Sequence, residues 1–258
     1  MSFVVIKNLS KSYMDDNTKP TQSIRVLNSI NLEIDKGEFI TFFGPNGCGK
    51  TTLLNIVAGL IDCDSGSVEI DGKRPKETKI GYIFQNFSDS LFPWRRNIDN
   101  IAFPLELQNI PKAERYSRVY ALGEELDIDL PLNNYPYQLS AGQQQLVAIL
   151  RALVSNPKIL LMDEPFGSLD YTTRIRLENE LLKIWEKTKT TILLVSHDIE
   201  EGIYLGDRLA LISKKPANIV EIIKNTLPRP RTLEIYKSPS FFELKAKSLE
   251  IFKQEMAK

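Results

Sequence analysis

One short segment of the sequence combines glycines, a lysine and a threonine in an arrangement suited to binding phosphate. Residues 44–51 read Gly-Pro-Asn-Gly-Cys-Gly-Lys-Thr and fit the pattern G-x-x-x-x-G-K-[ST]. The glycines let the backbone curve so that several N–H groups point at one anion. Lys50 supplies positive charge for phosphate oxygens, and the Thr51 hydroxyl suits Mg²⁺. The candidate nucleotide contacts are Gly44, Pro45, Asn46, Gly47, Cys48, Gly49, Lys50, Thr51 and Thr52.

Two adjacent carboxylates follow a strand of the buried type. Ile159–Met162 is apolar throughout, and Asp163 and Glu164 come directly after it. Acidic residues at the carboxyl end of a parallel strand lie where such sheets bind ligands. Asp163 could hold Mg²⁺ through water, and Glu164 could act as a general base on an attacking water. Without the phosphate loop, the same pair would be interpreted as two solvated carboxylates in a turn.

A helix start and a histidine complete the set of candidate groups. Leu139–Gln143 reads L-S-A-G-Q before a helical stretch. Ser140 can cap that helix, and the small residues leave its N–H groups open to an anion; an ordinary helix start is the alternative. His197, the only histidine, follows the expected strand Thr191–Val195. Its neutral imidazole can donate to a γ-phosphate, although a structural histidine is the alternative.

Strands alternating with helices must position these groups. The phosphate loop follows the apolar run Glu38–Phe43 and precedes the helical run Lys50–Leu60, a context that favours phosphate binding over a chance match. Arg25–Asp35 alternates so that Val26, Ile30, Leu32 and Ile34 share a buried face. Further strands are expected at Phe3–Lys7, Ser67–Ile70, Lys79–Phe84 and Arg208–Ile212, and further helices at Arg96–Gln108, Pro111–Leu126, Gly142–Val154, Thr172–Lys187 and Ser240–Gln254.

This alternation predicts an α/β fold with a largely parallel sheet covered on both faces. A block of helices over about 87–156 interrupts the alternation and predicts an inserted helical subdomain. Pro111 suits the first turn of its helix, the polar stretch Asp15–Ser23 is expected to be a loop, and Leu227–Arg231 is expected to be extended.

Composition narrows the class of protein further. The 258 residues carry 33 Lys plus Arg and 33 Asp plus Glu, so the formal net charge is zero. Nucleic-acid binders usually show a basic excess, and we expect no nucleic-acid partner. We see no apolar run of the ~18 residues that a transmembrane helix needs and no secretory signal, which predicts a cytosolic protein. Cys48 and Cys63 are expected to be reduced thiols.

In this order along the chain, the motifs resemble the ATP-binding subunits of ABC transporters over about residues 2–230. The resemblance implies a P-loop ATPase fold over 1–232, with an N-terminal antiparallel β portion, and a helical tail over 233–258. It implies that ATP is hydrolysed with Mg²⁺. Glu164, His197 and Gln85 would be catalytic, Thr51, Gln85 and Asp163 would hold the metal, and Tyr13 would stack on adenine. An ordinary half-buried tyrosine is the alternative for Tyr13.

The same resemblance implies a head-to-tail dimer that closes on two ATP molecules. Ser140, Gly142, Gln143 and Asp170 of one copy would contact the nucleotide held by the other, and closure would drive membrane subunits. The sequence departs from the family pattern at Ala141, where glycine is usual, and at Leu146, where arginine is frequent. A methyl group at position 141 could crowd the phosphate if the backbone there needs a positive φ.

Two segments resemble the group of importers for nitrate, sulfonates and taurine: Ser90–Arg95, which reads S-L-F-P-W-R, and Leu227–Arg231, which reads L-P-R-P-R. This likeness implies uptake of a small anionic solute and a peripheral position on the cytoplasmic face of the membrane. The implied partners are a second ATPase subunit, polytopic permease subunits and, indirectly, a solute-binding protein. Phe92 and Trp94 would line a groove for the permease, or else pack within the helical subdomain.

Two other classes of function remain as alternatives. A soluble ABC ATPase acting on DNA or ribosomes usually carries long coiled coils or tandem ATPase domains, and we find neither pattern. A regulator that binds nucleotide without hydrolysing it would not need both Glu164 and His197.

Overall fold

The computed structural model describes residues 2–14 and 23–257. Contacts divide the chain into two compact units, one made of Met1–Thr78 with Thr191–Lys258 and the other of Lys79–Thr190. The part of the predicted polar loop at 15–22 lies outside the described residues. No helix in the described ranges has the length and apolar character needed to cross a membrane.

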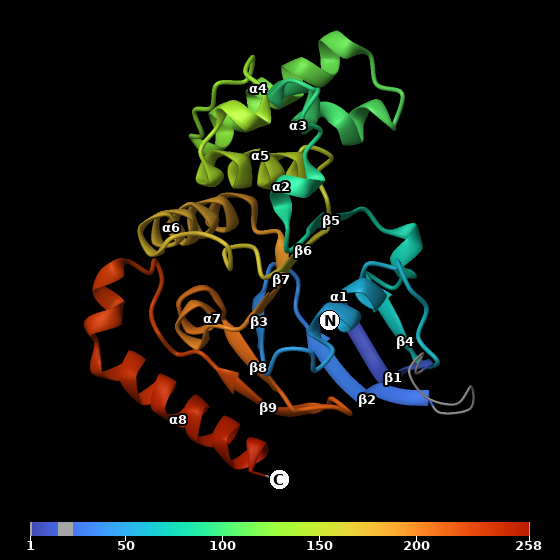
Figure 1. The fold of residues 1–258 in the computed structure, drawn as a ribbon, viewed down its shortest axis with the longest axis vertical. Helices are drawn as coiled ribbons and strands as arrows, with labels where there is room; N and C mark the ends of the chain where they lie inside the picture. The colour runs from blue at the N-terminus through green and yellow to red at the C-terminus, as the bar shows by residue number, and fades with distance from the viewer. Residues whose placement is uncertain (1, 15–22, 258) are drawn as a thin grey trace. The chain divides into compact units, whose positions relative to one another are not determined.

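The first unit contains an antiparallel sheet of strand order β2-β1-β4 (Figure 1). Its strands are β1 (Val4–Met14), β2 (Ser23–Ile34) and β4 (Ser65–Ile70), and Val4 pairs with Ile34 on one side and Ile70 on the other. The predicted buried face of β2 is confirmed, because Val26, Ile30, Leu32 and Ile34 are all buried.

The same unit contains strands that are parallel and apolar. β3 (Phe39–Phe43) pairs in parallel with β7 (Thr191–Ser196) on one side and β8 (Arg208–Ile212) on the other, and β9 (Ile219–Lys224) adds antiparallel to β8. Every residue of β3 and β7 is buried, as expected of parallel strands covered on both faces. The helices of this unit are α1 (Lys50–Val57), α7 (Ile199–Leu205) and α8 (Pro239–Met256), with 3₁₀ turns at Pro75–Glu77 and Leu233–Lys237.

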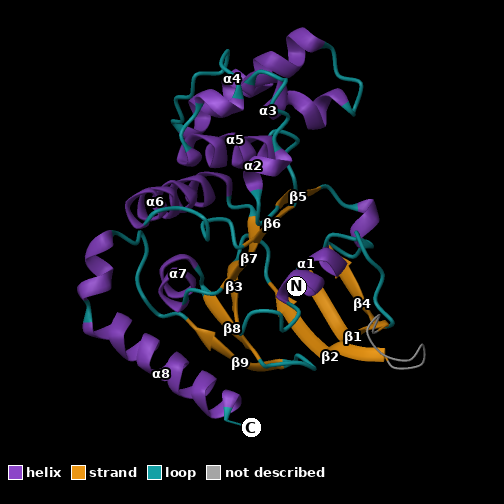
Figure 2. Ribbon diagram, in the orientation of Figure 1, coloured by secondary structure: helices purple, strands orange, loops and turns teal. Residues whose placement is uncertain are grey.

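The second unit is mostly helical (Figure 2). Its parallel strands β5 (Ile80–Ile83) and β6 (Ile159–Asp163) pair Ile83 with Met162. Its helices are α2 (Phe87–Ser90), α3 (Asn97–Glu106), α4 (Lys112–Leu126), α5 (Ala141–Leu153) and α6 (Tyr171–Thr188), with a 3₁₀ turn at Pro136–Gln138.

The predicted α/β class is confirmed, with corrections to single elements. The helix after the phosphate loop ends at Val57 and not at Leu60, because the chain reverses through Gly59 at φ 70°. Pro111 precedes its helix as the N-cap residue, with ψ 144°. Neither α7 nor β9 was predicted: α7 has only 7 residues, and β9 is a hairpin partner of β8 reached through Pro216.

Candidate functional site

The phosphate loop leaves β3 and ends where α1 begins. Gly49 is the N-cap residue of α1 at φ 122°, no side chain caps this helix, and its first turn contains no acidic residue. The first N–H groups of a helix lack partners within the helix, and the positive end of the helix dipole favours an anion there. The first N–H groups of α1 are therefore left open at the end of the loop, where the sequence predicts an anion.

Lys50 lies across the base of this loop. Its Nζ donates to the carbonyl oxygens of Gly44 at 2.8 Å and Pro45 at 3.0 Å, and the residue is only 5% exposed. Thr51 is exposed beside it. Cys48 is buried, and burial raises the pKa of its thiol, so this thiol is neutral and inward-facing at neutral pH. Cys48 and Cys63 are both free, as predicted.

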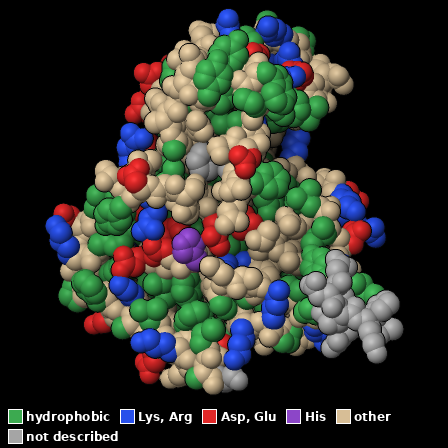
Figure 3. All heavy atoms as spheres, viewed as in Figure 1, with side chains coloured by type: hydrophobic (Ala, Val, Ile, Leu, Met, Phe, Trp, Pro, Cys, Tyr) green, Lys and Arg blue, Asp and Glu red, His purple; other side chains and the backbone are tan. Residues whose placement is uncertain are grey.

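His197 belongs to the same sheet edge as the phosphate loop. Ser196, the last residue of β7, pairs with Phe43, the last residue of β3. The next residues, His197 and Gly44, therefore leave two adjacent parallel strands at the same level. His197 is exposed, and Figure 3 shows the imidazole of this only histidine at the surface. Its predicted position beside the phosphate loop is thus the one observed.

Tyr13 lies on the neighbouring antiparallel sheet, near the phosphate loop. A Cβ atom on Gly49 would lie 2.7 Å from Val26 of β2. Tyr13 of β1 pairs with Ile24 of β2, which lies two residues, or about 7 Å, from Val26 along that strand. Tyr13 is 41% exposed, so its ring is available for stacking. Lys11 lies 5.6 Å from the ring centroid and pairs with Asp64 at 2.9 Å.

Gln85, Asp163 and Glu164 come together in the second unit, at the carboxyl edge of its parallel strands. Ile83 of β5 pairs with Met162 of β6. Gln85 and Glu164 each come two residues after these paired residues, so they leave the two strands at the same level. Asp163 is 4% exposed, and Gln85 is exposed. Burial, and then the nearby Asp163 carboxylate, raises the pKa of Tyr82. Glu164 adopts φ 45°, a left-handed conformation that is uncommon for a side-chain-bearing residue and often found at functional sites.

Ser140, Gly142 and Gln143 form a third group together with Asp170. Ser140 caps α5 by accepting from the Gln143 N–H at 3.3 Å, and Gln143 Oε1 accepts from the Ser140 N–H at 3.0 Å. Asp170 caps α6 by accepting from the Thr173 N–H at 3.0 Å. Hydrogen bonding to the Thr173 side chain, and then to this N–H, lowers the pKa of Asp170.

The starts of α5 and α6 touch one another. A Cβ built on Gly142 would lie 2.9 Å from both Thr173 Cγ2 and Arg176 Nη2. A larger residue at this position would require the side chains of Thr173 and Arg176 to move, so Gly142 has a packing reason for being glycine. Two helix N-termini thus lie side by side, and their positive dipole ends favour an anion.

The two departures from the family pattern are accommodated. Ala141 is the exposed first residue of α5, and its φ is not positive. The condition under which its methyl group would crowd a phosphate is therefore absent. Leu146 is half-buried within the same helix.

The segment after Gln85 divides between packing and exposure. Phe92 packs on Phe103 with ring centroids 4.7 Å apart, and its backbone is held by Asn100, which accepts at 2.8 Å and donates at 3.0 Å. Arg151 donates at 2.6 Å to both the carbonyl and the hydroxyl of Ser90. Trp94 is 72% exposed. Packing within the subdomain therefore accounts for Phe92 but not for Trp94.

Residues around His197 that the sequence did not single out also belong to this site. Ser196 Oγ accepts from the Asp198 N–H at 2.9 Å and donates to the carboxylate of Glu201. Asp198 caps α7 by accepting from the N–H groups of Glu200 at 2.9 Å and Glu201 at 3.4 Å. The run Ser-His-Asp-Ile-Glu-Glu at residues 196–201 is a recognisable helix start, and it could have revealed α7.

Comparisons with known proteins agree with this arrangement. Residues 27–167 match the family model described as ABC transporter, and the chain belongs to that family. An ABC transporter ATP-binding protein of Methanocaldococcus jannaschii is 43% identical over 98% of this chain and 92% of its own length. The aliphatic sulfonates import ATP-binding protein of Bacillus cereus is 43% identical over 96% of this chain and 95% of its own. The taurine import ATP-binding protein of Escherichia coli is 41% identical over 83% and 82%.

Solved structures give the same result. A dimeric bacterial ABC transporter cassette has a TM-score of 0.73 at 32% identity and covers 87% of this chain and all of its own. The same cassette in a post-hydrolysis state with ADP and phosphate scores equally. The protein is accordingly an ABC-type ATPase that binds and hydrolyses ATP, and the predicted resemblance to the sulfonate and taurine group is confirmed.

Proposed function

We propose that this chain is the ATP-hydrolysing subunit of an ABC importer that takes up a small anionic solute such as a sulfonate, taurine or nitrate. The observation that carries this proposal is the likeness to the Bacillus sulfonate import subunit over 96% of the chain. Such coverage includes the segments Ser90–Arg95 and Leu227–Arg231, which had suggested this branch of the family. The soluble ATPase acting on DNA or ribosomes is not favoured.

The phosphate loop receives the triphosphate in this proposal. Lys50 exchanges its present carbonyl partners for the β- and γ-phosphates, and the uncapped N–H groups of α1 bind the same anion. Gly44–Thr52 thus binds phosphate, and Tyr13 stacks on the adenine. The exposure of Tyr13 and of the Gly47 side of the loop supports these roles.

Thr51, Gln85 and Asp163 would hold Mg²⁺ through their side-chain oxygens in this proposal, as the family resemblance implies. The described residues contain no group of three or more His, Cys, Asp and Glu side chains that could hold a metal. Mg²⁺ keeps several waters and binds substrate phosphates alongside one or two carboxylates, and Asp163 would supply such a carboxylate. The bound ion would neutralise developing charge on the phosphate oxygens.

Glu164 accepts the proton of the attacking water, and His197 donates a hydrogen bond to the γ-phosphate. The left-handed backbone of Glu164 and the exposed position of His197 support these roles. A general base of this kind is worth about 10²–10⁴ in rate. Gln85 orients the water and the metal at the edge it shares with Glu164.

A second ATPase subunit completes each site in this proposal. The adjoining N-termini of α5 and α6 carry Ser140, Gly142, Gln143 and Asp170 and would contact the nucleotide held by the partner copy. ATP favours the closed dimer because only that state completes the γ-phosphate contacts. The dimeric form of the similar cassette supports this assembly.

The membrane partners follow from the family. Polytopic permease subunits would hold the chain at the cytoplasmic face of the membrane, and a solute-binding protein would deliver the solute. Trp94, an exposed aromatic residue in the segment after Gln85, would contact the permease.

Two measurements test the proposal. Glu164→Gln should retain ATP binding and lose about 10²–10⁴ of kcat, whereas Glu124→Gln, an exposed glutamate on α4, should match the wild type. Equal turnover by Glu164→Gln and wild type would remove the catalytic assignment. Purification in mild detergent should recover a polytopic permease, and recovery of nucleic acid or ribosomal proteins in its place would refute the importer.

A further inference from the structure

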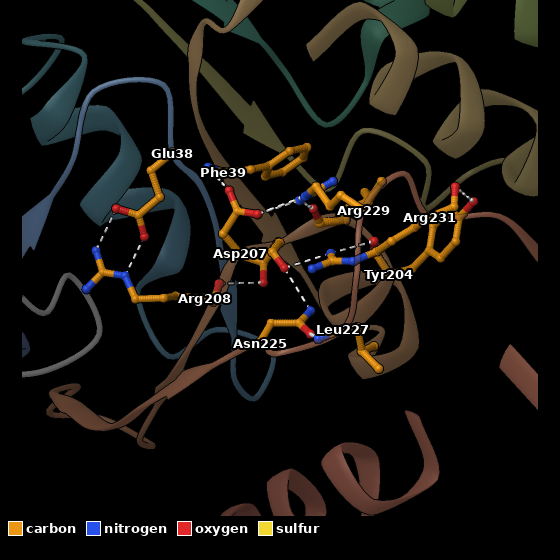
Figure 4. Close-up of polar contacts among 12 residues, drawn as sticks. Glu38, Phe39, Tyr204, Asp207, Arg208, Asn225, Leu227, Arg229 and Arg231 are labelled. Carbon is orange, nitrogen blue, oxygen red and sulfur yellow. Dashed lines mark hydrogen bonds and ion pairs between the residues drawn. The ribbon is translucent and has the colours of Figure 1, made fainter. Parts of the chain in front are cut away.

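The C-terminal end of α7 is closed by side chains from distant parts of the first unit. The last four carbonyl groups of any α-helix lack partners within the helix. In α7, Thr41 Oγ1 donates to the carbonyl of Gly202 at 3.1 Å, and Arg229 donates to Leu205 at 2.6 Å. Arg231 Nη1 donates to the carbonyls of Ile203 at 3.2 Å, Tyr204 at 2.9 Å and Gly206 at 2.8 Å. Figure 4 shows Arg229 and Arg231 beside Tyr204 at this end of the helix.

Arg231 is buried at the end of α7, where it makes these contacts. It is 5% exposed, and burial lowers its pKa to about 10, so its guanidinium stays protonated at neutral pH. A cation is favoured at the negative end of a helix dipole. A buried arginine that donates to three backbone carbonyls of another segment fixes the position of that segment.

Arg229 ties the same helix end to β3. Its Nε donates to Asp207 Oδ1 at 2.9 Å, and Asp207 Oδ2 accepts from the Phe39 N–H at 3.0 Å. The side-chain amide of Asn225 also donates to the carbonyl oxygens of Ile203 at 2.6 Å and Gly206 at 2.8 Å. The end of α7 is thus fixed relative to the strand that leads into the phosphate loop.

His197 lies at the other end of the same helix. α7 has 7 residues and is about 10 Å long. Asp198 caps its first turn, and the Ser196 hydroxyl links β7 to Glu201 within that turn. A shift of α7 along its axis would therefore move the backbone on either side of His197.

Apolar packing alone does not fix that axial position. Ile199 and Ile203 share a buried cluster with Phe43 and Phe241, but apolar contacts are non-directional. Hydrogen bonds to carbonyl oxygens weaken steeply as they bend. The hydrogen bonds from Arg229 and Arg231, together with those from Thr41 and Asn225, therefore set where α7 ends along its axis.

We propose that Arg231, assisted by Arg229, is a positioning residue for ATP hydrolysis that acts through α7 on His197. The proposal rests on the catalytic role proposed for His197. It gives the segment Leu227–Arg231 a function within the ATPase, namely to hold the helix behind the γ-phosphate contact.

The test compares three variants of the full-length chain in steady-state ATP hydrolysis. Arg231→Gln should lower kcat about tenfold to a hundredfold, the effect of small misplacement at a reacting centre, while KM and the affinity for a fluorescent ATP analogue stay within about twofold. Arg231→Lys keeps the charge and some donors, so its kcat should fall between those of Arg231→Gln and wild type. The matched control is Arg208→Gln, because Arg208 forms a half-buried ion pair with Glu38 and makes no hydrogen bond to α7; its kcat should equal that of the wild type.

A double variant shows whether Arg231 works through His197. If it does, His197→Ala with Arg231→Gln has the same kcat as His197→Ala alone, since residues acting as a unit are not additive. A further loss in the double variant, or an equal loss in Arg208→Gln, would mean that Arg231 acts only on general stability and would overturn the inference.

The remaining outcomes separate the inference from the proposed function. Wild-type kcat in Arg231→Gln, with His197→Ala impaired, would refute the inference and leave the role of His197 standing. Wild-type kcat in His197→Ala would refute that role and the inference with it. If circular dichroism shows that Arg231→Gln does not fold, Arg231→Lys alone and combined with His197→Ala decides by the same comparison.

Discussion

Replacing Gly49 by alanine would test the geometry of the phosphate loop directly. Gly49 adopts φ 122°, and an added Cβ would lie 2.7 Å from Val26 Cγ1 and 3.0 Å from Leu27 Cδ2. Such a backbone conformation costs a side-chain-bearing residue about 1–3 kcal/mol. Crowding a packed interior costs about 1–3 kcal/mol more. We therefore expect Gly49→Ala to lose about 4 kcal/mol of unfolding free energy, the sum of these two terms.

Gly47 supplies the matched control within the same loop. It also has a positive φ, 72°, but no atom lies within 4 Å of an added Cβ. Only the left-handed backbone, about 1–2 kcal/mol, opposes alanine there, and the reduced entropy of the unfolded chain offsets about 0.4–1 kcal/mol of that cost. Gly47→Ala should therefore lose about 1 kcal/mol. Its new methyl group would enter the open side of the loop, so ATP affinity should fall at least about tenfold, or 1.4 kcal/mol.

Urea denaturation and binding of a fluorescent ATP analogue would measure these two effects separately. With an unchanged m-value, the midpoint gives the stability difference, and for a chain of this size ~4 kcal/mol corresponds to a Tm about 8–16 °C lower. If Gly49→Ala loses no more stability than Gly47→Ala, the contact with Val26 and Leu27 does not constrain the loop. If Gly47→Ala binds ATP like the wild type, the open side of the loop does not receive the phosphates.

Two further predictions concern the segment after Gln85. Trp94→Ala should leave stability and basal ATP hydrolysis unchanged, because the side chain is 72% exposed, but it should abolish transport in proteoliposomes that contain the permease. Unchanged transport would show that Trp94 does not contact the permease. The control is Tyr120→Ala, whose side chain is 53% exposed. Arg151→Met should lose up to about 3–6 kcal/mol of unfolding free energy in urea denaturation, because two charge-assisted hydrogen bonds to Ser90 of about 1.5–3 kcal/mol each disappear. An unchanged midpoint would show that the cost of burying the guanidinium cancels the contribution of these two hydrogen bonds.

Much of the site could be predicted because its patterns are local. Asp163 follows an unbroken apolar strand, Ser140 precedes a helix with glutamine three residues later, and the phosphate loop stands between a strand and a helix. Each is decided by residues within one turn or one strand. The structure pairs the ends of β3 and β7, and those of β5 and β6, so residues far apart in sequence reach a common sheet edge in each unit.

The elements that were not predicted have little apolar periodicity along their own length, although α7 does have a recognisable start at Asp198. α7 contains a glycine, Gly202, and two adjacent glutamates in 7 residues, so its apolar periodicity is too short to recognise. Glycine suits this position because a Cβ would lie 3.0 Å from Leu209 and 3.3 Å from Thr41, so that these side chains would have to move. Its reason is therefore the close approach of β3 and β8, which no local window of the sequence contains. β9 likewise forms only because β8 offers it a free edge.

The two ends of α7 show how local and distant information combine at this site. Asp198, one residue after His197, caps the start of the helix by bonding N–H groups within its first turn. The end of the helix depends on Arg229 and Arg231, which come more than twenty residues later and reach back to its carbonyls. A helix start can be coded by one polar side chain, but carbonyl groups need donors, and here distant arginines provide them. The residue proposed to contact the γ-phosphate is thus recognisable from its neighbours in sequence, whereas its position depends on a segment that carries no catalytic group.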